Sequence, residues 1–148
     1  MNPIAFDIAN QLEEEELGTV ASTEAWGIFV ETMPDEPTKC IAVSDGPSPP
    51  PGITAGMDEE PFERCMFQIR VRGRSYKETY DKIQAASKAL TGQGKGRWLV
   101  EEDEVPVVEY KGIFRQSDFL PLVSGEKGVY IRSVNLLALR QELAAEVE

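Results

Sequence analysis

Residues 64–78 read RCMFQIRVRGRSYKE, and this stretch decides the fold because it joins the clearest strand of the chain to its clearest helix start. From 64 to 74 the apolar and polar side chains alternate with the period of two that is typical of a half-buried strand. The apolar side holds Cys65, Phe67, Ile69 and Val71; the polar side holds Arg64, Gln68, Arg70, Arg72 and Arg74, with Met66 the one exception. A register slip of one residue would bury the arginines, so the register is strongly determined.

A helix is predicted directly after this strand. Ser75 and Glu78 have the spacing of a capping box, in which the serine hydroxyl and the glutamate carboxylate accept from amides at the helix start. Apolar residues then recur at helical spacing down to Gly92, namely Tyr76, Tyr80, Ile83, Ala86 and Leu90. We interpret the two tyrosines as core residues in preference to a ligand site.

A first helix is predicted at the amino-terminal end, over about Pro3–Leu17. Asn2 and Pro3 fit the N-cap and first-turn positions, and Gly18 fits the C-cap. Two short strands, Trp26–Met33 and Lys39–Ser44, are predicted to pair as a hairpin across the proline-containing break between them.

The remaining strands are predicted after the second helix. They are Arg97–Val100, interrupted by the acidic run Glu101–Glu104, then Val107–Arg115, and Val129 to about Ala138, beyond which strand and helix both fit. Phe119–Leu122 reads as a loop and Gly125–Gly128 as a turn. The order α-β-β-β-α-β-β-β predicts a single α+β domain over residues 1–148, with a mostly antiparallel sheet and two main helices packed on one face.

A proline-rich loop spans residues 45–62. It holds Pro47, Pro49, Pro50, Pro51 and Pro61 with three glycines, which excludes a helix or a central strand. Such long loops in compact domains are usually functional or disordered. Because proline reduces the entropy lost on ordering, a docking arm is one interpretation of this loop, and a loose connection is the other.

Composition narrows the possible functions. The 148 residues carry a net charge of −11, yet residues 64–97 hold nine basic and two acidic side chains (+7), which leaves six basic and 24 acidic elsewhere (−18). The negative overall charge disfavours free nucleic acid as the main partner, whereas separated charges suit docking to a protein.

The same composition disfavours a catalytic function and a zinc site. The chain contains no histidine and only two cysteines, Cys40 and Cys65, which removes the commonest general base and the usual zinc ligands. We expect buried free thiols, no metal or cofactor, and a binding protein rather than an enzyme. No apolar run is long enough for a membrane span and no secretion signal is evident, so we expect a cytosolic origin.

Four segments, taken in order, resemble the small phage tail-terminator proteins, also described as minor capsid or head–tail joining proteins. The first is a strand ending in a Met-Pro-Asp turn, and the second leads into the proline-rich loop. The third is the strand that runs into Ser75-Tyr76, and the fourth is a closing strand. The segments are Gly27–Asp35, Cys40–Val43 with Gly46, Phe67–Arg72 with Ser75-Tyr76, and Gly125–Leu136.

This resemblance implies a structural virion protein at the head-proximal end of the tail, assembled in the host cytoplasm. It would form a homo-oligomeric, hexameric ring that caps the completed tail tube and provides a surface for head–tail joining. Its partners would be the tail tube protein and a head–tail connector protein, with genomic DNA passing through the lumen and no membrane contact. A head-completion protein docking on the portal is the alternative, followed by an RNA-binding α/β domain that uses the arginine face, and distantly by an enzyme with carboxylate chemistry at Asp58-Glu59-Glu60.

Candidate interface residues follow from charge, proline content and exposed apolar character. They are Arg70, Arg72, Arg74, Pro49, Pro50, Pro51, Ile53, Met57, Asp58, Glu59, Glu60, Phe119 and Leu120. A ring needs two different, complementary patches on each subunit. The arginine face is one candidate, and Asp58–Glu63 or Glu101–Glu104 is the other, unless the arginines face an acidic rim of the tail tube.

Overall fold

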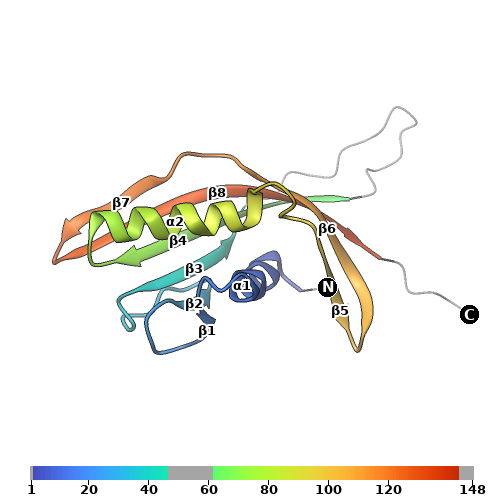
Figure 1. Ribbon diagram of the computed structural model, residues 1–148, viewed down its shortest axis with the longest axis horizontal. Helices are drawn as coiled ribbons and strands as arrows, with labels where there is room; N and C mark the ends of the chain where they lie inside the picture. Colours follow the sequence, from blue (N-terminus) through green and yellow to red (C-terminus); the bar gives the residue numbers. More distant parts are fainter. Residues whose placement is uncertain (1, 47–61, 144–148) are drawn as a thin grey trace, which may run out of the picture.

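The computed structural model describes residues 2–46 and 62–143, which form an α+β structure with a mostly antiparallel, curled sheet, as predicted (Figure 1). The elements are α1 (Ile4–Glu14), β1 (Thr19–Val20), β2 (Gly27–Val30), β3 (Cys40–Asp45), β4 (Glu63–Gly73), α2 (Tyr76–Thr91), β5 (Trp98–Glu102), β6 (Val105–Arg115), β7 (Leu120–Glu126) and β8 (Val129–Glu142).

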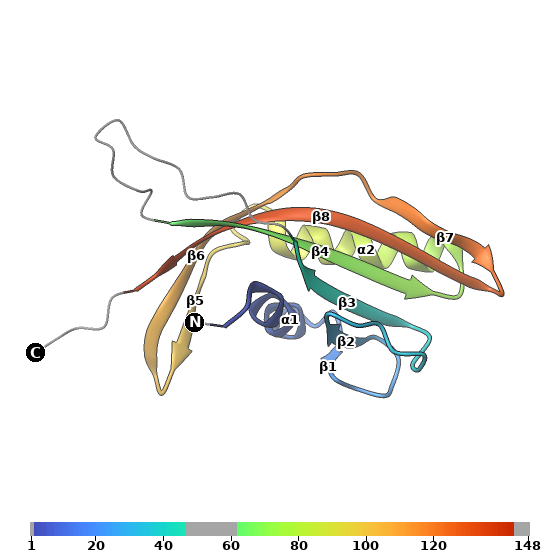
Figure 2. The same ribbon diagram turned by 180° about the vertical axis from the view of Figure 1, so that it is seen from behind.

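The sheet is organised around its two long central strands, β4 and β8. Its order is β1-β2-β3-β4-β8-β6-β5, and β7 also pairs with β8. β4 and β8 are antiparallel from Glu63↔Arg140 to Gly73↔Tyr130. β6 and β7 pair with successive halves of β8, so the β7–β8 turn and the β5–β6 hairpin lie at opposite ends of the molecule (Figures 1 and 2).

The core lies on the apolar face of β4, as the alternation predicts. Cys65, Phe67, Ile69 and Val71 are all buried. α1 packs mainly against β2 and β3, while α2 packs against β4, β8 and β6. The same cluster of buried side chains includes residues from both helices and from β8: Ile8, Leu12, Ile83, Leu90, Val134 and Leu136.

The predicted hairpin between the first two strands is wrong, because β2 and β3 are parallel, with Gly27↔Cys40 and Val30↔Val43. Residues 31–39 carry the chain back along the sheet instead of reversing it. Short buried strands have the same apolar pattern in either direction, so periodicity could not distinguish the two arrangements.

Both predicted ends of the first helix also need correction. Pro3, not Asn2, occupies the N-cap, and the Asp45 carboxylate at the end of β3 accepts a hydrogen bond from the Ala5 amide at 2.8 Å. At the other end, Glu16 adopts φ +62° and the Leu17 amide donates to the Leu12 carbonyl at 3.0 Å. This Schellman motif ends the helix before Gly18.

The segment Phe119–Leu122, interpreted as a loop, mostly belongs to a strand, since β7 begins at Leu120. Register shifts between Pro121 and Val123 and between Ser124 and Glu126 disrupt the alternation that would have indicated a strand. The predicted turn that follows is present, with positive φ at Lys127 and Gly128. β8 continues as a strand to Glu142, which resolves the open choice beyond Leu137.

Candidate interaction surface

The predicted arm residues lie outside the described part of the chain. These are Pro49, Pro50, Pro51, Ile53, Met57, Asp58, Glu59 and Glu60. Their proposed contact with another protein stays a prediction. The other candidates are described: the three arginines lie on or next to β4, Phe119 belongs to a second surface, and Leu120 is exposed at the start of β7.

Arg72 holds the connection between β2 and β3 in place. Its Nε donates to the Thr38 carbonyl at 2.9 Å, and its Nη2 donates to the carbonyls of Pro37 at 2.9 Å and of Pro34. These backbone acceptors come from a segment more than thirty positions earlier in the sequence. The guanidinium group therefore satisfies several carbonyls of a connection that has no regular hydrogen-bond ladder of its own.

The other two arginines of the predicted arginine face, Arg70 on β4 and Arg74 directly after it, differ in their hydrogen bonds. Arg70 Nη2 donates to the Glu31 carbonyl at 2.7 Å and to Ser44 Oγ at 3.0 Å. Arg74 is exposed and donates to Thr38 Oγ1 at 3.2 Å. These three arginines thus range from a half-buried structural role at Arg72 to a surface position at Arg74.

A second surface combines aromatic rings and guanidinium groups at the start of α2. Tyr76 and Tyr80 are nearly parallel, with an interplanar angle of 7° and ring centroids 6.3 Å apart. The Arg132 guanidinium from β8 lies 4.9 Å from the Tyr76 ring and 5.3 Å from the Tyr80 ring. Tyr76 is 59% exposed, so the interpretation of this tyrosine as a core residue is wrong.

The connection between β6 and β7 extends this surface. The Phe119 ring meets Tyr80 edge-on at 5.8 Å, and the Arg115 guanidinium lies 4.9 Å from the Phe119 ring. The Phe119 carbonyl accepts from Arg132 Nη1 at 2.7 Å, which fixes the connection to β8. We name the whole set the aromatic–arginine row; it consists of Tyr76, Arg132, Tyr80, Phe119 and Arg115.

Sequence reasoning selected only Phe119 from this row as an interface residue. The row draws on three separate elements, and Tyr76 and Tyr80 share the helical spacing of the core residues. One signal was available: Tyr76 is the first residue of the helix, and a side chain in the first turn can lie beyond the edge of the sheet that the helix covers.

A buried polar cluster joins α1 to the ends of β4, β6 and β8. Tyr110 Oη donates to Asp7 Oδ2 at 2.6 Å, and Arg140 donates to Glu63 Oε2 at 3.2 Å and to the Asn2 carbonyl at 2.9 Å. Burial raises the pKa of the Asp7 carboxyl, although Tyr110 and Arg140 act in the opposite direction. The polar groups of this cluster satisfy one another's hydrogen bonds, which indicates a structural role.

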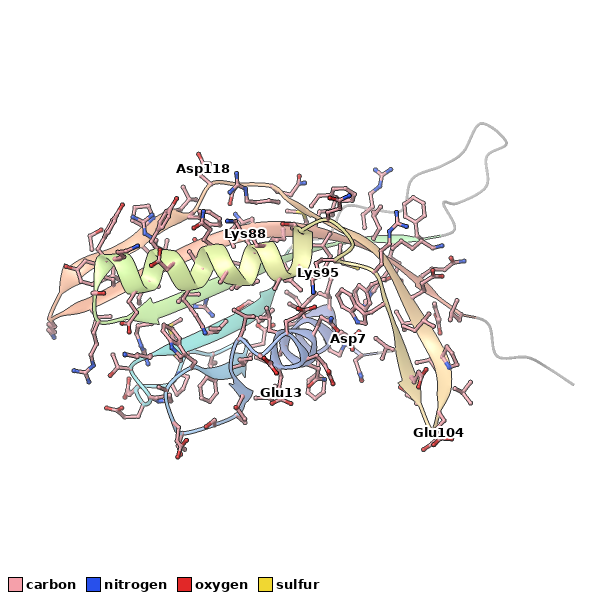
Figure 3. All side chains as sticks on the ribbon, viewed as in Figure 1. Asp7, Glu13, Lys88, Lys95, Glu104 and Asp118 are labelled. Carbon is pink, nitrogen blue, oxygen red and sulfur yellow. The ribbon has the colours of Figure 1, made fainter. Side chains whose placement is uncertain are left out.

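An acidic tip lies at the far end of the β5–β6 hairpin (Figure 3). Asp103 and Glu104 form the turn, both with positive φ, and Glu101 and Glu102 precede them; all four are exposed. Leu99 and Val105 on the same hairpin are also at least half exposed. This hairpin therefore combines an acidic end with apolar sides.

Residues 2–46 and 62–143 contain no group of three or more cysteine, aspartate and glutamate side chains able to hold a metal ion. Neither helix is long and apolar enough to cross a membrane.

Comparison with known proteins gives one family. Residues 11–141 match the family model described as bacteriophage tail terminator protein, a span that runs from the end of α1 to the end of β8. No curated protein matches the chain.

Proposed function

Because the chain belongs to the bacteriophage tail terminator family and is thus a structural component of the phage tail, we propose that it caps the completed tail tube as a hexameric ring. The ring would stop growth of the tube and offer the surface to which the head connector joins. The family match over residues 11–141 is the observation that carries this proposal.

The distribution of exposed charge supports head-to-tail contacts between subunits. The acidic tip of the β5–β6 hairpin lies at one end of the molecule (Figure 3), while exposed Arg74 and Lys127 lie near the start of α2 and in the β7–β8 turn, at the other end (Figure 1). A ring requires a contact between two different patches, and opposite charges at opposite ends meet that requirement.

Charge alone would not hold such a ring together. An exposed ion pair contributes only about 0–1 kcal/mol, so charge would select the orientation of neighbouring subunits while apolar contacts supply affinity. Leu99 and Val105 flank the acidic tip and are suited to that second task. β5 is also an edge strand, so its backbone could add to the sheet of a neighbour.

Arg70 and Arg72 are poor probes of this interface despite their charge. Because both donate to backbone carbonyls of residues 31–38, their reversal to glutamate would disturb that connection as well as any contact with a neighbour. Arg74→Glu with Lys127→Glu is the cleaner charge reversal. This double variant should fail to assemble. Assembly should return in part when it is mixed with a second variant in which Glu101, Glu102 and Glu104 are changed to lysine.

Electron microscopy of phage particles lacking this protein tests the function directly. Loss of a tail terminator should give abnormally long tails without heads. Loss of a head-completion protein that docks on the portal should instead leave tails of normal length beside unjoined heads. Normal-length tails in the particles lacking this protein would therefore contradict the proposed function and favour the alternative.

A further inference from the structure

We infer that the aromatic–arginine row receives the tip of the β5–β6 hairpin from a neighbouring copy of this chain. The tip consists of residues 101–105, which are the acidic turn and the first residue of β6. This inference rests on the proposed ring and deepens it, because it assigns the two patches that would meet between adjacent subunits.

The row has the chemistry of a docking surface. Tyr76 exposes 59% of its surface although it lies against Tyr80 and Arg132. Arg115, at the other end of the row, is exposed as well. Tyrosine and arginine often dominate protein interfaces, because they combine a large rigid area with hydrogen-bonding groups.

The charge at the row is positive. Two guanidinium groups belong to it, and exposed Arg74 lies just before the first turn of α2. The carboxylates of Glu78 and Asp81 on α2 are each paired with a lysine, and Asp118 adds one negative charge beside Phe119. The row is therefore suited to an acidic occupant that also brings apolar surface to the rings.

The tip of the hairpin has this composition. Residues 98–110, which span the hairpin, contain five acidic side chains and no basic one. The carboxylates of Glu101–Glu104 are exposed and form no ion pair with any residue in the ranges 2–46 and 62–143. Val105 directly follows them and is 58% exposed. The tip thus offers carboxylates to the guanidinium groups and an aliphatic side chain to the rings.

The backbone of the turn gives an independent reason to assign a function to the tip. Asp103 and Glu104 adopt φ values of +50° and +65°. A two-residue hairpin turn with positive φ at both positions favours Asn-Gly, because a β-carbon is strained in this region. The acidic pair therefore costs stability in the free subunit, and strain of this kind concentrates at sites of binding and catalysis.

The tip cannot reach the row of its own subunit, because β6 itself separates them. The tip ends at Val105, and the nearest residue of the row, Arg115, lies at the other end of the strand, about 33 Å away at ~3.3 Å per residue. The rest of the row is farther from the tip. Arg115 pairs with Leu136 on β8, and Arg132 lies beyond Leu136 toward the β7–β8 turn.

The base of the hairpin is fixed, so the tip does not fold back. The Trp98 ring stacks on Tyr110 with centroids 4.3 Å apart, and Tyr110 Oη donates to buried Asp7 at 2.6 Å. The Leu143 amide donates to the Val107 carbonyl at 2.9 Å. The tip therefore points away from α2 (Figures 1 and 3), and repetition of a head-to-tail contact between tip and row builds a ring.

Three variants of the full chain test the inference. The row variant carries Tyr76→Ala with Arg115→Ala, the tip variant carries Asp103→Asn with Glu104→Gly, and the control carries Phe6→Ala, an exposed aromatic on α1. Ring assembly of the purified proteins is measured by sedimentation velocity and negative-stain microscopy. We expect the row and tip variants to need at least about tenfold higher concentration for assembly, and the control to assemble normally.

The tip variant separates binding from folding. Because Asn-Gly suits the backbone of this turn, its melting temperature should equal or exceed that of wild type while its assembly weakens. If the turn served only to form the hairpin, assembly would stay the same or improve together with stability. That result would overturn the inference.

Cysteine cross-linking locates the contact. The native thiols, Cys40 and Cys65, are buried, so cysteines introduced at exposed positions react first with a short bismaleimide. Glu101→Cys with Gln116→Cys in one chain places exposed thiols beside the tip and beside the row, and should give a ladder of covalent oligomers on a denaturing gel. An equimolar mixture of the two single variants should stop at dimers. The matched control replaces Gln116→Cys by Ala85→Cys, an exposed site on α2 outside the row, and should stay monomeric.

The remaining outcomes separate this inference from the proposed function. If wild-type protein neither forms rings nor caps isolated tails, the ring proposal fails and the inference fails with it. If wild-type rings form but the cross-linked ladder is absent, or is no stronger than with Ala85→Cys, only the inference fails. If the row variant forms rings normally but no longer binds isolated tails, the row receives the tail tube and the assigned occupant is wrong.

Discussion

Two arginine-bearing surfaces of this protein use the same side chain in different ways. Arg70 and Arg72 on β4 donate to backbone carbonyls of the segment that precedes β3, so their charge serves the fold. Arg115 and Arg132 lie against aromatic rings, one of which, Tyr76, is mostly exposed. The difference teaches that alternation along a strand indicates which face an arginine occupies, but not whether its charge is available to a partner.

The largest loss of stability is expected from the apolar face of β4, opposite the arginines, and the smaller losses below are compared with it. Phe67 is buried between the sheet and the helices, and Phe67→Ala should destabilise the protein by about 3–5 kcal/mol through lost burial and a cavity. Urea denaturation measures this change. Leu122→Ala, at an exposed site, is the control and should change the free energy of unfolding by less than about 0.5 kcal/mol. Equal stability of the two variants would mean that the faces of β4 are misassigned.

Arg72→Met should give the next largest loss, roughly 2–4 kcal/mol, because it removes charge-assisted hydrogen bonds and leaves several carbonyls without a donor. Methionine keeps much of the aliphatic bulk, so the loss reports mainly on the guanidinium group. Arg74→Met is the matched control, at the exposed end of the arginine face, and should lower the free energy of unfolding by less than about 1 kcal/mol. If the two substitutions cost the same, Arg72 does not hold the connection.

Ser75→Ala should cost about 1 kcal/mol, because the Glu78 amide loses the Ser75 hydroxyl that caps α2 at 3.1 Å. The cap matters to the comparison since it fixes the first turn of the helix, where Tyr76 lies. Thermal unfolding checks it against Ser124→Ala, an exposed serine outside any helix. An unchanged melting temperature for Ser75→Ala would exclude Ser75 as the cap.

The cap and the β4 pattern could be predicted because they depend on residues close together in sequence. Ser75 and Glu78 lie within one turn, and the alternation around Phe67 is complete within one strand. The ends of α1 could not be predicted, because the Ala5 amide finds its acceptor in Asp45, forty positions away. The parallel pairing of β2 and β3 could not be predicted either, because short buried strands have the same apolar pattern in both directions.

In the candidate site, too, features that depend on neighbouring residues could be predicted and features that depend on distant residues could not. Charge and spacing identified Arg72 correctly as a residue on the polar face of its strand. Its actual acceptors are backbone carbonyls of residues 34–38, and backbone groups leave no signal in a sequence. The aromatic–arginine row was missed as a unit, because Arg115, Tyr80 and Arg132 belong to three elements that only the fold brings together.

A smaller, pH-dependent effect is expected in the first turn of α2. Glu78 binds Lys39 at 2.6 Å, and this hydrogen bond lowers the pKa of the Glu78 carboxyl from its ordinary value of 4.5. A depressed folded-state pKa contributes stability above the unfolded value, and that stability is lost as the pH falls through the folded value. Wild type should therefore be more stable than Glu78→Gln at neutral pH, and the difference should vanish in acid. A difference that is constant with pH would contradict this origin.

Tyr76→Ala should have the smallest effect on stability, although it removes the most exposed ring of the aromatic–arginine row. Loss of an exposed cation–π contact costs about 0.5–1 kcal/mol. Alanine regains part of this, because its helix propensity is better than that of tyrosine by up to about 0.5 kcal/mol. The free energy of unfolding should thus change by about 0.5 kcal/mol or less, similar to the Phe6→Ala control on α1. Tyr76→Ala is expected to impair ring assembly without a loss of stability. Arg72→Met is expected to impair assembly only through its loss of stability. If Tyr76→Ala destabilises the chain as much as Arg72→Met does, the two surfaces do not differ, and the row serves the fold rather than a partner.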